Sequence, residues 1–433
     1  MVFEAIQPGP PDPMNLLKTT ADADTSPDKV DLGVGIYRNE KGNYQELASV
    51  REAKVQLLQN DPGHDYECTT GNVDFIKHAA GVMFGRDSAL LAAGKIASVQ
   101  TISGTGAVHL AAQFISRFVH PSPTVYVGTP TWGNYKPLCE LVGLQIVEFQ
   151  QYDSEKRTLD FPAILAAVRS APRASVFIFQ ACCHNPTGMD PTRAQWDELR
   201  AAVRDMGHFP VFDNAYQGLG DGLDEDAYVV RSWAAEGIEM FVCQSFSKNF
   251  ALYGERCGVL HAFCPAGAGA ARNVHDQLRC LIRWEFSSSP AYGSRLVTRI
   301  LSSEELRSKW ENELSVMRQR LKGNRELLFK LLTEEYKVSK LLQRRKNISI
   351  FAWVSAKIKP LKYLNQTPGN WQHILEEKGL FSYFRLSPAQ CRALVDKHHI
   401  YLPTNGRINI SGLNDANAKR VASKIDEVVR DTQ

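Results

Sequence analysis

The stretch Ser245-Phe246-Ser247-Lys248-Asn249-Phe250-Ala251-Leu252-Tyr253-Gly254-Glu255-Arg256 decides how this chain is interpreted. Its lysine follows an apolar run that favours a β-strand, and hydroxyl side chains precede it. A deprotonated lysine amine is a nucleophile that forms a Schiff base with an aldehyde. Ser245 and Arg256 offer the hydroxyl and the forked N–H donors that bind a phosphate. The stretch therefore points to pyridoxal 5'-phosphate, although a surface lysine after an ordinary strand would read the same way.

The composition narrows the class of protein. With 433 residues, the chain is long enough for two domains and a large core. Its 50 Lys and Arg nearly balance 47 Asp and Glu, so no nucleic-acid or membrane-surface partner is favoured. No apolar run is long enough to cross a bilayer. The nine cysteines are scattered and include no C-x-x-C pair, and the first residues do not resemble a signal or transit peptide. We therefore expect a cytoplasmic protein with reduced thiols.

Strand-like and helix-like patterns alternate between about residues 46 and 300. The expected strands are residues 98–102, 124–127, 145–149, 176–179, 211–213 and 240–245. The expected helices between them include residues 107–119, 159–169 and 193–206. This alternation predicts an α/β domain with a mainly parallel sheet, in which ligands bind at the carboxyl ends of the strands.

The pattern changes after residue 304, where a long charged helix is expected at 304–332. Short strands at 379–384 and 407–411 and a last helix at 417–430 then indicate a smaller domain. The first 30 residues are rich in Pro and Asp and are interpreted as an arm. We therefore expect an arm with part of the small domain at 1–45, a large cofactor-binding domain at 46–315 and a small domain at 316–433.

Short motifs follow several of the expected strands. Ser103, Gly104 and Thr105 open a helix after the first strand, where close backbone approach, hydroxyls and the helix N-terminus can cradle a phosphate. Pro186 keeps Asn185 extended, so its amide can reach out from the sheet edge. Taken alone, the first motif fits a plain strand–helix turn better than a phosphate site, and the second motif equally fits a plain turn.

The segment after residue 211 carries a carboxylate and a phenol. Asp213 can keep a pyridine nitrogen protonated, which makes the ring an electron sink, and Tyr216 can reach the phenolate oxygen of that ring. A helix N-cap is the alternative interpretation of Asp213.

These motifs occur in one order, each at an expected strand end, and together they resemble the fold-type I pyridoxal phosphate enzymes. Within that group the chain looks like an aspartate aminotransferase of the class I aminotransferase family, which also includes aromatic aminotransferases. The resemblance covers nearly the whole chain, with specific matches at 30–38, 129–132, 184–188, 212–218, 245–256 and 406–413. It implies a large domain with a mainly parallel seven-stranded sheet between helices, a smaller α+β domain and a homodimer with shared active sites.

The resemblance also implies roles for single residues. Lys248 would form the Schiff base and carry the proton in a 1,3-proton transfer, Asp213 would pair with the pyridine nitrogen, and Tyr216 would assist at the phenolate oxygen. The implied cofactor-binding residues are Ser103, Gly104, Thr105, Trp132, Asn185, Asp213, Tyr216, Ser245, Lys248, Arg256 and Tyr66, the last from the partner subunit. The implied substrate-binding residues are Gly35, Trp132, Asn185, Arg283 and Arg407. No metal is expected.

The two arginines of that set would define the substrates, which are amino acids and 2-oxo acids. Arg407 would clamp the α-carboxylate, and Arg283 would reach across the dimer to a side-chain carboxylate. The expected reaction is L-aspartate plus 2-oxoglutarate to oxaloacetate plus L-glutamate. Outside the motif context, Trp132 would be interpreted as a core tryptophan. Arg283 and Arg407 would each be interpreted as a surface arginine on a helix.

The chain departs from the family pattern at several positions. Tyr135 and Gln180 stand where family aspartate enzymes carry histidines behind the pyridine-binding aspartate, and neither titrates near neutral pH. Glu285, close to Arg283 in sequence, is expected to be able to pair with it and weaken its grip on a substrate carboxylate. An enzyme for aromatic or specialised amino acids, or a lyase or decarboxylase on the same scaffold, is therefore the alternative function. A non-catalytic binding protein is disfavoured because it has no need of Lys248.

Residues 336–365 fit nothing in the family pattern. The segment is basic and contains an apolar patch at 348–354. A surface insertion and a retained intron remain equal interpretations, and neither involves the cofactor.

Overall fold

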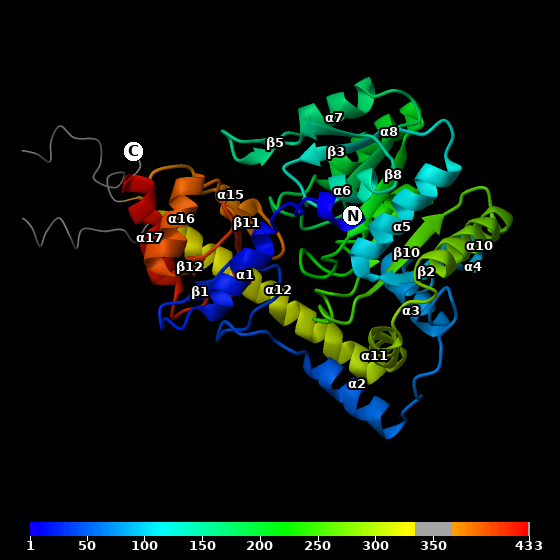
Figure 1. Cartoon of the computed structure of the whole chain (residues 1–433), viewed down its shortest axis with the longest axis horizontal. Coiled ribbons are helices and arrows are strands. Elements are labelled where there is room, and N and C mark those ends of the chain that lie inside the picture. The colour runs from blue at the N-terminus through cyan, green and yellow to red at the C-terminus, as the bar shows by residue number, and fades with distance from the viewer. Residues whose placement is uncertain (334–365, 432–433) are drawn as a thin grey trace, which may run out of the picture. The chain divides into compact units, whose positions relative to one another are not determined.

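The computed structural model describes residues 1–333 and 366–431, which form two compact units (Figure 1). The larger unit contains residues 44–322 and 376–381, and the smaller contains 1–43 with the described parts of 323–375 and 382–433. Helix α12 (Glu304–Thr333) contains the division between the two units, which falls between residues 322 and 323. The segment 336–365 lies outside the described residues.

The larger unit is built on a seven-stranded sheet with the order β2-β10-β9-β8-β7-β3-β4. Its strands are β2 (Ile96–Ile102), β3 (Val125–Thr129), β4 (Ile146–Gln150), β7 (Val176–Gln180), β8 (Phe209–Asn214), β9 (Met240–Ser245) and β10 (Cys257–Phe263). Strand β10 runs antiparallel to both of its neighbours, and the remaining pairs of adjacent strands are parallel. The predicted mainly parallel seven-stranded sheet is confirmed.

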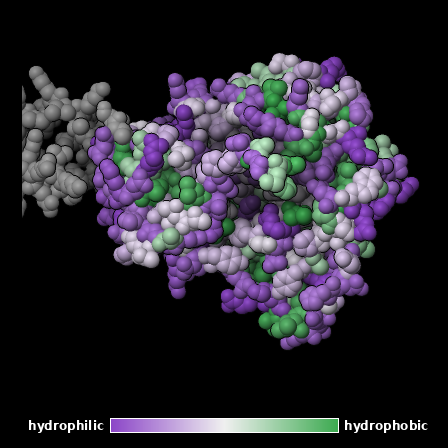
Figure 2. Space-filling model, in the orientation of Figure 1, coloured by the Kyte–Doolittle hydropathy of each residue, from purple (hydrophilic) through white to green (hydrophobic). Residues whose placement is uncertain are grey.

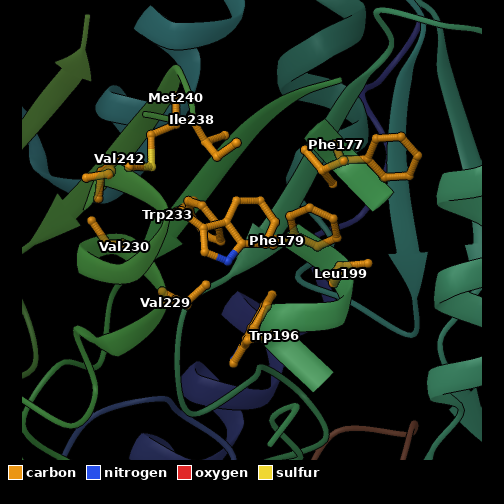
Figure 3. Close-up of a cluster of buried hydrophobic side chains, with 14 of the residues drawn as sticks. Phe177, Phe179, Trp196, Leu199, Val229, Val230, Trp233, Ile238, Met240 and Val242 are labelled. Carbon is orange, nitrogen blue, oxygen red and sulfur yellow. The ribbon is translucent and has the colours of Figure 1, made fainter. Parts of the chain in front are cut away.

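Helices cover both faces of this sheet, because alternate residues of each strand point to opposite faces. On β7, Phe177 and Phe179 pack into one core, shown in Figure 3, while Val176 and Ile178 pack into the other. The first core is closed by α3 (Val73–Phe84), α7 (Phe161–Ser170), α8 (Arg193–Met206) and α9 (Tyr228–Ala235). The second is closed by α5 (Ser103–Phe118), α6 (Tyr135–Glu140) and α10 (Ala268–Glu285).

Further short elements complete the larger unit. They are α2 (Ala48–Gln59), α4 (Ala89–Ala92), α11 (Ala291–Ser302) and the antiparallel pair β5 (Tyr152–Asp153) and β6 (Thr158–Leu159).

The smaller unit consists of helices with two short strand pairs. Strand β1 (Val30–Asp31) pairs in parallel with β12 (Ile400–Tyr401), and β11 (Phe381–Tyr383) pairs with β13 (Arg407–Asn409). Its other elements are η1 (Val2–Ala5), α1 (Pro13–Ala23), α15 (His373–Glu376), α16 (Pro388–His398), η3 (Ile410–Gly412) and α17 (Ala418–Asp431). The division between the two units passes through α15 and β11. The predicted arm is thus partly helical, since Asp12 caps α1 by accepting hydrogen bonds from the backbone of Met14 and Asn15.

Hydrophilic residues dominate the face of the molecule in Figure 2, where hydrophobic residues occur as separate patches. Among the described helices, none combines the length and apolar character that a membrane span requires. All nine cysteines are free thiols.

Candidate active site

One edge of the sheet collects the residues that the sequence singled out. Strands β2, β7, β8 and β9 all end at this edge because they run in the same direction. A cavity lies there, within the larger unit. Its lining consists of Ser103, Gly104, Thr105, Trp132, Gln180, Asn185, Asp213, Ala215, Tyr216, Ser245, Ser247, Lys248 and Arg256. Ten of the predicted residues therefore meet in one cavity.

One end of the cavity is a cluster of hydroxyls beside a helix N-terminus. The Ser103 Oγ atom lies 3.0 Å from Ser245 Oγ and 2.7 Å from Ser247 Oγ. Arg256 Nη1 donates to the Tyr253 carbonyl at 3.0 Å and lies 3.5 Å from Ser247 Oγ. Helix α5 begins at Ser103, so its first backbone N–H groups have no partner inside the helix. Hydroxyls, amides and a guanidinium together form an anion cradle, a name used below for Ser103, Gly104, Thr105, Ser245, Ser247 and Arg256.

Glycines make room for this cradle. A Cβ atom at Gly104 would lie 3.2 Å from Ser245 Cβ, tighter than an ordinary contact, and 4.0 Å from Asp213 Oδ1. On β10, a Cβ atom at Gly258 would lie 2.6 Å from the carbonyl carbon of Ser103. The backbone that carries the cradle thus lies directly against the sheet.

A buried carboxylate also lines the cavity. Asp213 is 8% exposed near the end of β8, and Tyr135 donates a 2.7 Å hydrogen bond from its hydroxyl to Asp213 Oδ2. Burial raises the pKa of the Asp213 carboxyl, while this hydrogen bond and the charge of Lys248 oppose the rise. The side chain does not cap a helix but faces the cavity with a basic residue nearby.

Polar contacts also fix the loop after β7. The Asn185 backbone N–H donates to Gln180 Oε1 at 2.7 Å, and Gln180 Nε2 donates to the Asn185 carbonyl at 2.9 Å. Behind this loop, His184 contacts Thr187 and Gln151 at 2.8 Å each, and burial lowers the pKa of its imidazole to about 3. The loop that presents Asn185 is held by these contacts and by the Asp190 carboxylate, which accepts from the backbone N–H groups of Cys183 and His184 at 2.7 and 3.0 Å.

Lys248 also lines the cavity. It follows β9 by three residues, and its Nζ atom lies 5.0 Å from the centre of the Tyr216 ring. Trp132 contributes an aromatic wall and meets Tyr135 edge to face, with ring centres 5.2 Å apart. An amine, an aromatic wall, a carboxylate and an anion cradle thus surround one space.

Two predicted residues of the larger unit do not line this cavity. Tyr66 is 88% exposed and borders a separate groove with Leu58 and Tyr292. Arg283 is exposed near the end of α10 and donates a 2.5 Å hydrogen bond to Ser287 Oγ.

The expectation that Glu285 can pair with Arg283 is corrected by the structure. Residues two apart on a helix do not face each other. The Glu285 carboxylate instead lies 3.1 Å from His109 Nδ1 on α5, and the Trp284 ring lies 5.2 Å from the Arg117 guanidinium. The carboxylate closest to Arg283 in sequence is therefore directed elsewhere.

The remaining two predicted residues lie together in the smaller unit. Arg407 Nη2 donates to the Gly33 carbonyl at 2.7 Å. Asn409 Nδ2 donates to the carbonyls of Val34 and Ile36, at 2.6 Å each, and so fixes the backbone on both sides of Gly35.

Sequence reasoning missed two lining residues, Ser247 and Ala215. Ser247 was recognisable, since it stands between Ser245 and Lys248 with the same hydroxyl. Gln180 was noticed as a departure, but its contact with Asn185 required the structure.

Comparison with known proteins gives one consistent answer. Residues 27–425 match the family model described as aminotransferase class I and II. The chain is 40% identical over 431 residues to aminotransferase tasG of Hapsidospora irregularis, covering 99% of this chain and 97% of that protein. It is 37% identical over 445 residues to the cytoplasmic aspartate aminotransferase of Saccharomyces cerevisiae, covering 99% and 97%.

Solved structures agree. The yeast cytoplasmic aspartate aminotransferase superposes with a TM-score of 0.89 at 36% identity, covering 100% of this chain and 99% of that one. An aromatic-amino-acid aminotransferase of Burkholderia pseudomallei, covalently bound to pyridoxal phosphate, superposes with a TM-score of 0.88 at 33% identity, covering 99% and 100%.

Proposed function

The chain belongs to the class I and II aminotransferases, which depend on pyridoxal phosphate, and from this premise we propose that it exchanges amino groups between L-aspartate and 2-oxoglutarate. The products would be oxaloacetate and L-glutamate. One observation carries the proposal: the amine, the buried carboxylate and the anion cradle surround a single cavity.

The donor set of this cavity fits pyridoxal phosphate. A phosphate monoester needs hydroxyl, amide and guanidinium donors, which the anion cradle supplies. A pyridine N–H needs a buried acceptor, which Asp213 supplies while Tyr135 occupies its other oxygen. Asn185 and Tyr216 would hold the phenolate oxygen, and Trp132 would lie against the ring.

When bound, the cofactor supplies an electron sink that stabilises negative charge at the substrate α-carbon. The chain's own residues do the rest. Lys248 Nζ would bond the cofactor aldehyde in the resting enzyme, and after release it would take the α-proton and return it to the cofactor carbon. Asp213 would keep the ring nitrogen protonated throughout.

The substrate class rests on two arginines. Arg407 and the loop around Gly35 would bind the α-carboxylate, and their mutual contacts fix both within the smaller unit. Arg283 would bind the side-chain carboxylate of aspartate or glutamate. Its assignment is supported by the direction of Glu285 toward His109, since this carboxylate does not neutralise the Arg283 charge that would attract a substrate carboxylate.

Arg283 and Tyr66 would act in the cavity of a second copy. Both are exposed and neither lines the cavity of its own chain. Exposed Leu58, Tyr66 and Tyr292 share one mainly apolar groove, a surface suited to burial between two copies. The proposed protein is therefore a homodimer that binds small molecules, with residues from both subunits in each active site.

The first test is spectroscopic. The purified holoenzyme is titrated separately with L-aspartate, L-glutamate and L-tyrosine while the cofactor absorbance is recorded. We expect the two dicarboxylates to convert the cofactor to its amino form at the lowest concentrations, and 2-oxoglutarate to reverse the change. A preference for tyrosine would replace the proposal with an aromatic aminotransferase, the activity named for the Burkholderia pseudomallei neighbour.

A subunit-mixing experiment tests the shared site. Lys248→Ala and Arg283→Leu homodimers should each be poor with aspartate. A mixed dimer would contain one site with both residues intact, so mixing after mild dissociation should restore activity. If mixing restores none although mixed dimers are isolated by differential tags, Arg283 does not serve the partner's site.

Cytoplasmic location is part of the proposal. Nine free thiols and the cytoplasmic name of the yeast relative support it. Cell fractionation of the tagged protein checks it, and recovery with mitochondria would contradict it.

A further inference from the structure

Asp213 is held by a phenol from a distant part of the chain. Tyr135 is 1% exposed on α6, and its hydroxyl donates to Asp213 Oδ2 at 2.7 Å across 78 positions of sequence. Its ring packs in the second core and meets the Trp132 ring edge to face, and this packing restricts the position of the hydroxyl.

The Tyr135 hydroxyl and the Lys248 charge both oppose the rise in the Asp213 pKa that burial causes, but only the Tyr135 hydrogen bond stays the same throughout the proposed reaction. Burial raises the pKa of the Asp213 carboxyl, and the Tyr135 hydrogen bond and the Lys248 charge both lower it. The amine of Lys248 is the proposed nucleophile, so its charge changes during the reaction. Tyr135 keeps its proton, because burial and Asp213 raise the pKa of its phenol well above the ordinary value.

From this arrangement we propose that Tyr135 is a positioning residue that keeps Asp213 an oriented carboxylate, so that Asp213 itself adds no pH dependence to cofactor affinity around neutrality. The inference rests on the proposed function, in which Asp213 pairs with the ring nitrogen. It adds to that function a residue whose hydroxyl touches neither cofactor nor substrate in the proposed reaction.

Most of the other groups around Asp213 keep the same charge in the proposed reaction, as this role of Tyr135 requires. Tyr135 from α6, Cys243 from β9, Tyr216 after β8 and Lys248 after β9 interact electrostatically with it or with Tyr135. Burial raises the pKa of the Cys243 thiol well above its ordinary value, so this neighbour stays neutral. Gln180, opposite Asp213 in the strand register, does not titrate. Of these neighbours, Lys248 alone changes charge in the proposed reaction.

The test measures cofactor binding to apoprotein, not turnover. Dissociation constants for pyridoxal phosphate are determined by fluorescence between pH 5 and 8.5. Tyr135→Phe removes the hydroxyl but keeps the ring. Because a hydrogen bond to a charged group is lost, affinity at neutral pH should fall roughly ten- to hundredfold. Asp213 would then take up a proton at higher pH than in the wild type, so the loss should grow toward pH 5.

A second variant separates positioning from packing. Tyr135→His restores an N–H donor, so affinity should recover in part, and its imidazole should add an inflection between pH 5 and 8 that the wild type lacks. Tyr152→Phe, which removes a hydroxyl from another buried tyrosine of the larger unit, should leave affinity and its pH dependence unchanged.

The outcomes are distinguishable. If Tyr135→Phe binds as tightly as the wild type across the pH range, or if the histidine variant shows no inflection, the inference is wrong while the proposed function stands. If the wild-type apoprotein does not bind pyridoxal phosphate, the proposed function fails instead. Near-ultraviolet circular dichroism of each apoprotein establishes that the fold is retained.

Discussion

The contact between Gly258 and Ser103 provides a quantitative test of how the sheet supports the anion cradle. A methyl group at Gly258 would lie 2.6 Å from the Ser103 carbonyl carbon, 2.7 Å from the Gln244 carbonyl oxygen and 2.8 Å from Ser103 Cα. All three are backbone atoms, which cannot turn aside as a side chain does. Because ordinary contacts begin near 3.4 Å, the two backbones must separate by most of an ångström.

Gly258→Ala should therefore destabilise the protein and weaken cofactor binding together. Overpacking of this kind costs about 1–3 kcal/mol. For a protein of this size that corresponds to a fall in Tm of about 1–3 °C in the apoprotein. Since Ser103 opens α5, the displacement also moves the cradle, and affinity for pyridoxal phosphate should drop in parallel.

The matched control is Gly254→Ala, four residues earlier, where an added methyl group meets nothing within 4 Å. It should change Tm by less than about 0.5 °C, as expected of a surface substitution. Thermal unfolding followed by circular dichroism and cofactor titration by fluorescence give both readouts. Equal Tm and equal affinity for Gly258→Ala and Gly254→Ala would refute the reasoning.

Three further predictions concern catalysis, specificity and pH. Lys248→Ala should abolish transamination while leaving Tm within a few degrees of wild type, and appreciable residual turnover would refute the assigned chemistry. Arg283→Leu should lower kcat/KM for aspartate by at least about thirtyfold but affect tyrosine far less, and an equal loss for both would count against its role. Burial raises the pKa of Asp226 from 3.8 to about 6, so the folded protein holds a proton that the unfolded chain releases between these values. The free energy of unfolding should therefore decrease as pH rises from about 4 to 6, by an amount on the order of 3 kcal/mol from this group. Denaturant unfolding of the wild type and Asp226→Asn across this range checks it, and identical pH slopes would contradict the assignment.

The strands of the sheet were predictable because most are continuous apolar runs followed by polar motifs. Residues 240–245 and 176–179 correspond closely to β9 and β7. Strand β10 was not predicted, although all seven of its residues are buried. Gly258 and His261 interrupt its apolar pattern, and its place between β2 and β9 depends on long-range pairing that no local pattern encodes.

The sequence alone predicted which residues gather around one cavity, since Lys248, Asp213 and the cradle residues lie at or close to strand ends and parallel strands end at one edge. The tertiary structure decided which neighbours support them. Tyr135 reaches Asp213 from 78 positions away, and Glu285 turns to His109 on α5 although Arg283 is two residues from it. Helix geometry sends residues two apart in different directions, so partners are chosen by packing between elements and not by proximity along the chain.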